Sequence, residues 1–241
     1  MIKKHLFLIA LSGLAMTACT QNKAEEANVN ETFAPCDIKI GSVTFSQSKN
    51  GATDGVTVCN DTIKFVAGPK TDYFRAPDGE STINTSPVLF TEIDNTKPFT
   101  FTARVEPKFT ETGTYSAGVV YAYENETHCQ KLCFEQDEYG DHRVVTVRTI
   151  GTSDDNNHQE IAGPFVYMRI SSDGKQIGSY FSEDGNTWHM ARLYKNDYPE
   201  KLLLGISSQS PTDNEHTCYF SDISLVNDAV SDFRNGRLGG N

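Results

Sequence analysis

The sequence predicts an all-β protein, built as a two-sheet sandwich or a jelly roll. Three observations lead to this prediction. Apolar and polar residues alternate with period two, as where Phe99, Phe101 and Ala103 are separated by threonines, and this spacing buries one face of a strand. Turn-forming residues such as Asp-Gly separate the alternating runs. No long segment beyond residue 18 shows helical periodicity. About a dozen strands with short turns in one domain are typical of two packed sheets.

The expected strands follow one another with short connections. Tight turns are expected at Pro-Asp-Gly 77–79, Tyr-Gly-Asp 139–141, Ser-Asp-Gly 172–174 and Glu-Asp-Gly 183–185, because these residues accept the backbone angles of a turn. Alternation predicts strands at 38–45, 56–66, 88–93, 99–105, 117–123, 130–135, 144–150, 166–171, 176–181, 202–207 and 218–226.

The single tryptophan, Trp188, ends the turn segment 182–188. Asp184 can accept hydrogen bonds from backbone N–H groups within this turn, and Gly185 supplies the positive φ of a tight hairpin. Trp188 could be a stacking platform for a sugar or a core plug beneath the hairpin. A tryptophan next to such a turn is mostly structural, so the plug is the preferred interpretation.

The first 19 residues have the pattern of a bacterial lipoprotein signal. Lys3 and Lys4 precede an apolar run at 6–16 that is too short to span a bilayer, and Cys19 follows Met-Thr-Ala. Cleavage before Cys19 and acylation of its thiol would tether the domain to a membrane. The alternative is an ordinary secretory signal cut after Ala18, which the large Met16 disfavours. Thr20 follows the cysteine instead of aspartate, which favours the outer membrane of a Gram-negative bacterium.

Composition divides the rest of the chain into a tether, a domain and a tail. Residues 19–32 are polar and predict a flexible tether, and residues 227–241 predict a flexible C-terminal tail. Residues 33–226 are long enough for one β domain with a substantial core, and no internal repeat divides them.

The chain is acidic. Its formal net charge is −11, and removal of residues 1–18 takes away two lysines and no acid, which changes the charge to −13. Nucleic acid and anionic lipid would both repel such a surface, so neither is an expected partner. Membrane contact is expected only through the lipid anchor.

Five cysteines remain after Cys19, and an odd number leaves at least one unpaired. Cys129 and Cys133 are four residues apart on an expected strand, so their Cα atoms would lie about 13 Å apart, too far for a disulfide. Cys36 with Cys59 is the preferred pair. Cys133 is expected to be a small buried hydrophobe, and no second cysteine pair completes a zinc site.

Nine segments together resemble a known family. They are YFRAPDG at 73–79, SPVLF at 86–90, AGVVY at 117–121, KLCFE at 131–135, VTVR at 145–148, TSDD at 152–155, SEDGNTW at 182–188, MAR at 190–192 and GISSQSP at 205–211. In order and spacing they resemble the concanavalin A-like domain-of-unknown-function family labelled "regulation of enolase", over residues 65–226. The resemblance implies a concanavalin A-like jelly roll with a concave face. Related domains accompany glycoside hydrolases, which favours a carbohydrate-related role.

A ligand site is expected on that face, with a polar lining. Lys131 and Glu135 are four apart on one strand and project from the same side. Arg148 lies on a nearby expected strand, and charged groups of this kind suit sugar hydroxyls. The other candidate ligand-binding residues are Ser153, Asp154 and Asp155 in the loop that follows, with Tyr121 or Tyr123, and Trp188, as stacking surfaces. The alternative is a salt-bridged polar sheet face without a ligand.

The sequence contains no convincing catalytic or metal motif. Glu-Gln-Asp-Glu at 135–138 places acids on a strand end, but Glu138 would point to the opposite face from Glu135, so a glycosidase pair is not indicated. The oxygen-rich run 154–157 could bind Ca²⁺ or be a solvated turn, and the turn is preferred. No other cofactor is indicated. The leading hypothesis is a lipid-anchored carbohydrate-binding protein. The alternatives are an envelope structural or protein-interaction domain and a glycan-active hydrolase.

Overall fold

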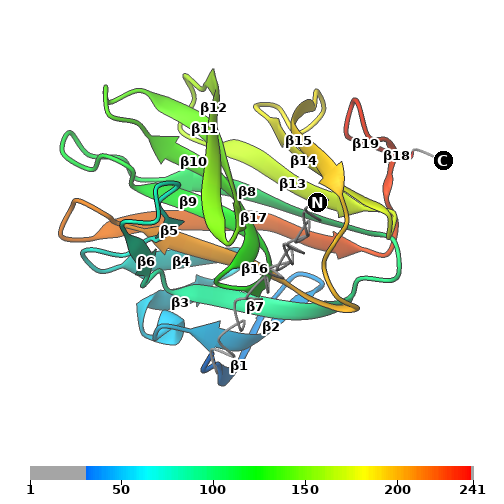
Figure 1. Ribbon diagram of the computed structural model, residues 1–241, viewed down its shortest axis with the longest axis horizontal. Coiled ribbons are helices and arrows are strands. Elements are labelled where there is room, and N and C mark those ends of the chain that lie inside the picture. The colour runs from blue at the N-terminus through cyan, green and yellow to red at the C-terminus, as the bar shows by residue number, and fades with distance from the viewer. Residues whose placement is uncertain (1–30, 240–241) are drawn as a thin grey trace, which may run out of the picture. The chain divides into compact units, whose positions relative to one another are not determined.

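Residues 31–239 are described by a computed structural model, and they form two antiparallel sheets that share one apolar core (Figure 1). Cys19, the signal segment 1–18 and most of the expected tether lie outside the described residues. The fold is the predicted concanavalin A-like jelly-roll sandwich.

The first sheet has eight strands. In spatial order they are β1 (Ala34–Ile40), β2 (Val43–Lys49), β7 (Val88–Asp94), β16 (Lys201–Gln209), β9 (Ala117–Asn125), β10 (His128–Gln136), β11 (His142–Ile150) and β12 (Thr152–Glu160).

The second sheet has seven strands. In spatial order they are β15 (His189–Lys195), β14 (Gln176–Ser182), β13 (Val166–Ser172), β8 (Phe99–Pro107), β17 (His216–Val226), β4 (Thr62–Ala67) and β3 (Val56–Cys59).

Two short hairpins and one helical turn complete the described residues. The hairpins are β5 (Tyr73–Arg75) with β6 (Thr82–Asn84), and β18 (Val230–Asp232) with β19 (Arg237–Leu238). A 3-10 turn at Ala52–Gly55 is the one helical element between residues 31 and 239. Across the same residues, no helix has the length and apolarity needed to cross a membrane.

The core between the sheets follows from the period-two pattern. Phe101, Ala103 and Val105 of β8 point into it, and Leu132 and Phe134 of β10 meet them from the eight-stranded sheet. Each of these side chains is fully buried. Burying one such side chain stabilises the fold by roughly 2 kcal/mol, so this core supplies most of the driving force for folding.

The eight-stranded sheet also buries residues on its other side, which we call the outer face. Tyr121, Tyr123, Phe90 and Val88 form a second apolar cluster there, and Tyr73 of β5 packs edge-on against both tyrosines. The β5–β6 hairpin therefore covers part of this face. The sequence predicted a polar lining for the concave face that holds the site, whereas this part of the outer face is apolar.

Several strands differ from their predicted bounds. The runs 38–45 and 56–66 each split into a hairpin, β1–β2 and β3–β4, because Gly41 and Asn60 adopt positive φ angles of 55° and 52°. The strands β12 and β15 were not predicted. Most of β12 is exposed on both faces, so its sequence has no hydrophobic alternation to reveal it.

Both ends of the domain extend further than predicted. Glu31, placed by the sequence in the flexible tether, accepts hydrogen bonds from the Lys49 ammonium, the Tyr123 hydroxyl and the Glu126 backbone, each at 2.6 Å. Its side chain is 7% exposed. Three donors thus fix this carboxylate in the fold.

The expected flexible C-terminal tail is instead folded as far as residue 239. Val230 is buried with Tyr180 and Trp188 in a third cluster. The Tyr180 hydroxyl donates to the Phe233 carbonyl at 2.9 Å, and the Arg169 guanidinium donates to the Gly236 carbonyl at 2.7 Å. The tail was mispredicted because its sequence is mostly polar, whereas a few apolar side chains and backbone carbonyls attach it to the sheet.

The preferred disulfide is not formed. Cys36 and Cys59 are both free, and Cys36 Sγ donates to the Phe45 carbonyl at 3.3 Å. Cys36 lies on β1 in the eight-stranded sheet and Cys59 on β3 in the other, so the sandwich separates them. Cys133 is fully buried, as predicted.

Candidate functional site

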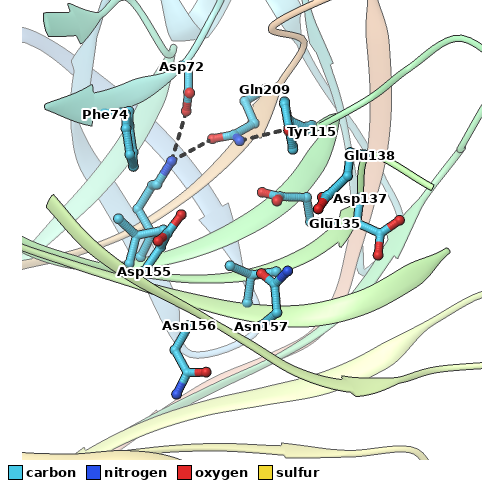
Figure 2. Close-up of a pocket in the computed structure, with 13 residues that line it drawn as sticks. Asp72, Phe74, Tyr115, Glu135, Asp137, Glu138, Asp155, Asn156, Asn157 and Gln209 are labelled. Carbon is cyan, nitrogen blue, oxygen red and sulfur yellow. Dashed lines mark hydrogen bonds and ion pairs between the residues drawn. The ribbon is translucent and has the colours of Figure 1, made fainter. Parts of the chain in front are cut away.

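A pocket of about 640 Å³ opens on the outer face beside the β5–β6 hairpin (Figure 2). Most of its lining side chains carry carboxyl, amide or amino groups. They are Asp72, Lys131, Glu135, Asp137, Glu138, Asp155, Asn156, Asn157 and Gln209, with Phe74, Tyr115, Val145 and Val147.

The sheet register brings one end of this pocket together. Gln209 of β16 pairs with Ala117 of β9, which in turn pairs with Glu135 of β10. The three residues therefore form a row across the sheet with their side chains on the outer face. Because Ala117 is small, the row leaves space between Gln209 and Glu135.

A second row forms the other end. Lys131 of β10 pairs with Val147 of β11, which pairs with Asp155 of β12. Between the two rows, Cys133 pairs with Val145, which pairs with Asn157. The pocket thus has an apolar floor with polar groups at its ends and on β12.

Lys131 is held by two acceptors. Its ammonium donates to Asp72 Oδ1 at 2.8 Å and to Gln209 Oε1 at 3.3 Å. Burial opposes the charge, but the neighbouring Asp72 carboxylate outweighs that effect, so the pKa of Lys131 is raised. The ammonium stays charged throughout the physiological range, in a fixed position.

Tyr115 contributes an aromatic ring in a strained backbone conformation. Its φ is +63°, which an aromatic residue rarely adopts. The strain is held by two backbone hydrogen bonds: Tyr115 N donates to Gln136 O at 2.7 Å, and Gln209 Nε2 donates to Tyr115 O at 3.1 Å. The residue is 43% exposed. Strain of this kind clusters at functional sites.

Glu135 is the most unusual group in the pocket. Its side chain is 8% exposed, and no group within residues 31–239 makes a hydrogen bond or ion pair with it at standard distances. Burial, opposed by Lys131 and assisted by the carboxylates of Asp72, Asp155 and Asp137, raises the pKa of Glu135 to about 8. A buried carboxyl without a partner is costly to maintain, so Glu135 is a strong candidate for ligand contact.

The β10–β11 turn is fixed by Asp137. This carboxylate accepts from the backbone N–H groups of Tyr139 and Asp141, both at 2.9 Å, and from Arg143 Nε at 2.6 Å. Burial alone would raise the pKa of Asp137, but these donors lower it. The turn places Glu138 in the pocket lining and leaves Tyr139 82% exposed. In Figure 2, Glu135, Asp137 and Glu138 lie together near Tyr115.

The β5 strand is attached to the far edge of the sheet. Arg75 N donates to Ser153 Oγ at 2.9 Å and Arg75 Nε donates to Gly151 O at 2.8 Å. These bonds hold Asp72 and Phe74 at the pocket. The predicted ligand residue Ser153 is buried and also bonds to Thr149 Oγ1 at 2.9 Å, so it supports the site without lining it.

Two predicted site residues lie on the wrong face. Arg148 has the opposite parity to Val147 on β11 and points toward the seven-stranded sheet, where its guanidinium donates to both carboxylate oxygens of Asp197 at 2.8 Å and covers the Tyr194 ring. Asp154 pairs with Arg192 at 2.9 Å on the same side. The predicted convergence of Arg148 with Lys131 and Glu135 is therefore wrong.

The segment 153–157 was expected to be a loop and is part of strand β12. Alternation along a strand sends Asp154 and Asp155 to opposite faces. Nowhere in residues 31–239 do three histidine, cysteine, aspartate or glutamate side chains gather to hold a metal.

The predicted stacking residues are not available. Tyr121 is fully buried under the β5–β6 hairpin. Trp188 is 8% exposed and packs with Tyr180 on the other sheet, where the Arg169 guanidinium lies 3.7 Å from its ring centroid. The core-plug interpretation of Trp188 is confirmed.

Sequence reasoning found Lys131, Glu135 and Asp155 and missed most of the remaining lining. Asp72, Phe74 and Gln209 lie within or beside the segments that carried the resemblance, but nothing in their local pattern marks them as ligand-facing. Tyr115 precedes strand β9, and only its backbone angle, which the sequence does not show, distinguishes it.

Solved structures with the same fold include one of similar size and several larger enzymes. A functionally unknown protein from Saccharomyces cerevisiae matches with a TM-score of 0.67 and 21% identity, over 75% of this chain and 95% of that one. A GH43 protein, BlXynB from Bacillus licheniformis, matches with a TM-score of 0.56 and 13% identity, over 75% of this chain and 36% of that one. A GH43B protein of a xyloglucan locus in Bacteroides ovatus matches with a TM-score of 0.55 and 12% identity, over 80% of this chain and 38% of that one.

These similarities establish the fold alone. The chain spans little more than a third of the length of the two glycoside hydrolases. No curated protein matches the sequence. One protein family does match, over residues 52–227, which includes the span 65–226 where the resemblance was expected. The chain therefore belongs to the family described as "Protein of unknown function (DUF1349)".

Proposed function

We propose that this protein binds carbohydrate in the outer-face pocket. The observation that carries the proposal is the unpartnered, buried carboxyl of Glu135 at the end of a polar cavity. A volume of about 640 Å³ lies within the range typical of small-molecule sites.

The lining has the chemistry that a sugar requires. Carboxylate and amide oxygens of Asp155, Asn157 and Glu135 accept hydrogen bonds from hydroxyl groups, while Lys131 donates to a hydroxyl or ring oxygen. Phe74 and Tyr115 offer apolar surface for the C–H face of a sugar ring. The apolar floor of Val145 and Val147 completes a mixed surface of the kind found in ligand pockets.

The comparisons give limited support. The larger chains that share this fold include glycoside hydrolases, but a shared fold does not transfer an activity. The proposal therefore depends on the pocket.

A glycan-array screen of the full-length protein tests the proposal. We expect binding to a defined set of glycans, weakened at least tenfold by Lys131→Met, because a charged hydrogen bond contributes roughly 1.5–3 kcal/mol. Arg148→Gln is the matched control: it removes a cation from the neighbouring strand on the opposite face, so it should leave glycan binding unchanged. Absence of binding across a broad array would refute the proposal.

A glycan-active hydrolase is a second candidate, favoured by one observation. A pKa of about 8 keeps Glu135 protonated at neutral pH, the state that a general acid needs. Hydrolysis also requires a second carboxylate across the glycosidic bond, for which Asp155 and Glu138 are the candidates in the pocket. Release of reducing ends from an array-positive glycan, abolished by Glu135→Gln, would support this activity.

We also propose that the protein is exported and lipid-anchored at Cys19, in the outer membrane of a Gram-negative bacterium. The basic start, the short apolar run and the residues Met-Thr-Ala before Cys19 support this proposal. Acyl chains would then hold the glycan-binding domain at a membrane surface.

A further inference from the structure

The charges around the pocket are unbalanced. Five carboxyl groups line it, together with one ammonium. Lys131 is paired with Asp72 at 2.8 Å, and Asp137 is paired with Arg143 at 2.6 Å. Neither Glu138 nor Asp155 has an ion-pair partner in the part of the chain that the structure describes, and Glu135 has none there either. Three carboxyl groups are therefore left without a counter-charge around one cavity.

Glu135 is the group among these three that points to a ligand. The other two are exposed to solvent, which screens their charge. Glu135 is buried at one end of the pocket, without a hydrogen-bond donor from residues 31–239. Lys131, the one cationic side chain in the pocket lining, is already bound to Asp72 and Gln209, and Arg143, which lies opposite Glu135 on β11, is bound to Asp137. The pocket thus presents a carboxyl group in a low-dielectric position, where its electrostatic attraction for a bound cation would be strongest.

We propose that the glycan recognised here carries a protonated primary amine, as a glucosamine unit does, and that Glu135 is the counter-ion of that amine. This inference rests on the proposed carbohydrate-binding function and narrows it to one class of sugar. The same surface repels glycans with carboxylate or sulfate groups, because they would add negative charge beside Asp155 and Glu138.

Binding of an amine should also release a proton. At neutral pH Glu135 is largely protonated, and a cation placed beside it favours its ionised form. The charged and titratable groups near Glu135 are Lys131 and Cys133 on its own strand, Asp72 before β5, Tyr115 before β9, Asp137 and Glu138 in the turn, Arg143 on β11 and Asp155 on β12. Of these, Lys131 keeps its charge because Asp72 raises its pKa.

The test compares three tetrasaccharides that share a β-1,4-linked backbone and differ at carbon 2. Chitosan tetramer has a free amine, chitin tetramer an N-acetyl group and cellotetraose a hydroxyl. Each is titrated into the full-length protein by calorimetry at pH 5.5, where both the free amine and Glu135 carry a proton before binding, in two buffers of different ionisation enthalpy. We expect the chitosan tetramer to bind at least tenfold more tightly than the other two, with a proton released on binding.

Two variants locate the effect. Glu135→Gln keeps the shape of the side chain and should reduce the affinity for chitosan tetramer at least tenfold and abolish proton release. Asp154→Asn is the control, because it removes a carboxylate from the same edge strand that supplies Asp155, on the opposite face. It should change none of these quantities. A melting curve of each variant establishes that it is folded.

The outcomes separate this inference from the function on which it rests. Equal affinity for all three tetramers, or preference for cellotetraose, would refute the proposed recognition of an amine. It would not contradict the proposed binding of carbohydrate. If the Glu135→Gln variant still prefers chitosan tetramer, Glu135 is not the counter-ion of the amine. Failure of all three tetramers to bind overturns the glucosamine assignment, while the broad array decides separately whether any carbohydrate binds.

Discussion

At the scale of single residues, Glu135 shows how burial changes the chemistry of an ordinary carboxyl group. The sheet register places it beside Ala117 and opposite Arg143, yet the Arg143 side chain turns to Asp137. Glu135 is left with burial and with neighbouring acids, both of which raise its pKa to about 8. The sequence identified Glu135 as a site residue by its spacing from Lys131. It could not show that Arg143 would pair with Asp137 instead of Glu135.

The raised pKa of Glu135 makes stability depend on pH. Because the folded pKa lies above the unfolded one, the contribution of Glu135 is fully present below about pH 4.5, the ordinary value, and is lost as pH rises through about 8. We expect the free energy of unfolding of the wild type to fall relative to Glu135→Gln across this window. The slope approaches a tenfold change in the folding equilibrium per pH unit. Urea denaturation at pH 5, 7 and 8.5 measures it, and parallel curves would contradict the assignment.

The position of Tyr115 requires a strained backbone conformation. A φ of +63° costs an aromatic residue about 1 kcal/mol, whereas asparagine tolerates this conformation. Tyr115→Asn should therefore leave stability unchanged or raise it by up to about 1 kcal/mol, and it should weaken glycan binding several-fold through loss of the ring. Denaturant midpoints and glycan titrations report the two quantities. Lower stability with unaltered affinity would show that the ring serves the fold only.

At the scale of elements, alternation located the strands that have one buried face. The β8 strand follows the pattern closely, with Phe101, Ala103 and Val105 in the core. The β12 strand has no such face and was mistaken for a loop. On β11, Val144 and Val145 are both buried, one on each face of the sheet. Alternation could not decide the direction of Arg148, because both sides of that sheet bury apolar residues.

The hairpin formed by β18 and β19 is an element whose removal should be costly. Val230 packs on Tyr180 and Trp188, and the Gly236 carbonyl accepts from Arg169 at 2.7 Å. Truncation after residue 227 should lower the free energy of unfolding by roughly 3 kcal/mol, through lost apolar burial and a lost charged hydrogen bond. The emission of Trp188 should shift to the red as its ring becomes exposed. Unchanged stability and emission would show that the hairpin is dispensable.

At the scale of the whole molecule, one sheet serves both the core and the site. Its inner face packs on the seven-stranded sheet, and its outer face holds an apolar cluster whose Val145 and Val147 form the floor of the pocket. The sequence predicted the sandwich and three lining residues, because both depend on spacing along strands. It did not predict Asp72, Phe74 or Gln209, since pairing between distant strands brings them to the pocket.

The lipid anchor proposed at Cys19 can be tested in the intact protein in a Gram-negative host. The wild type should incorporate an alkyne-labelled fatty acid and sediment with outer membranes, whereas Cys19→Ser should do neither. Cys36→Ser is the matched control and should keep the label, because Cys36 lies inside the β-sandwich domain. Labelling of the Cys19→Ser variant would refute the anchor.

A crystal structure of the protein soaked with an array-positive glycan would show directly where the sugar binds. We expect a sugar ring in the outer-face pocket, between Lys131 and Glu135, with Phe74 or Tyr115 against its C–H face. A glycan bound on the opposite face near Arg148 and Asp197, or at the edge strands away from β10, would contradict this expectation.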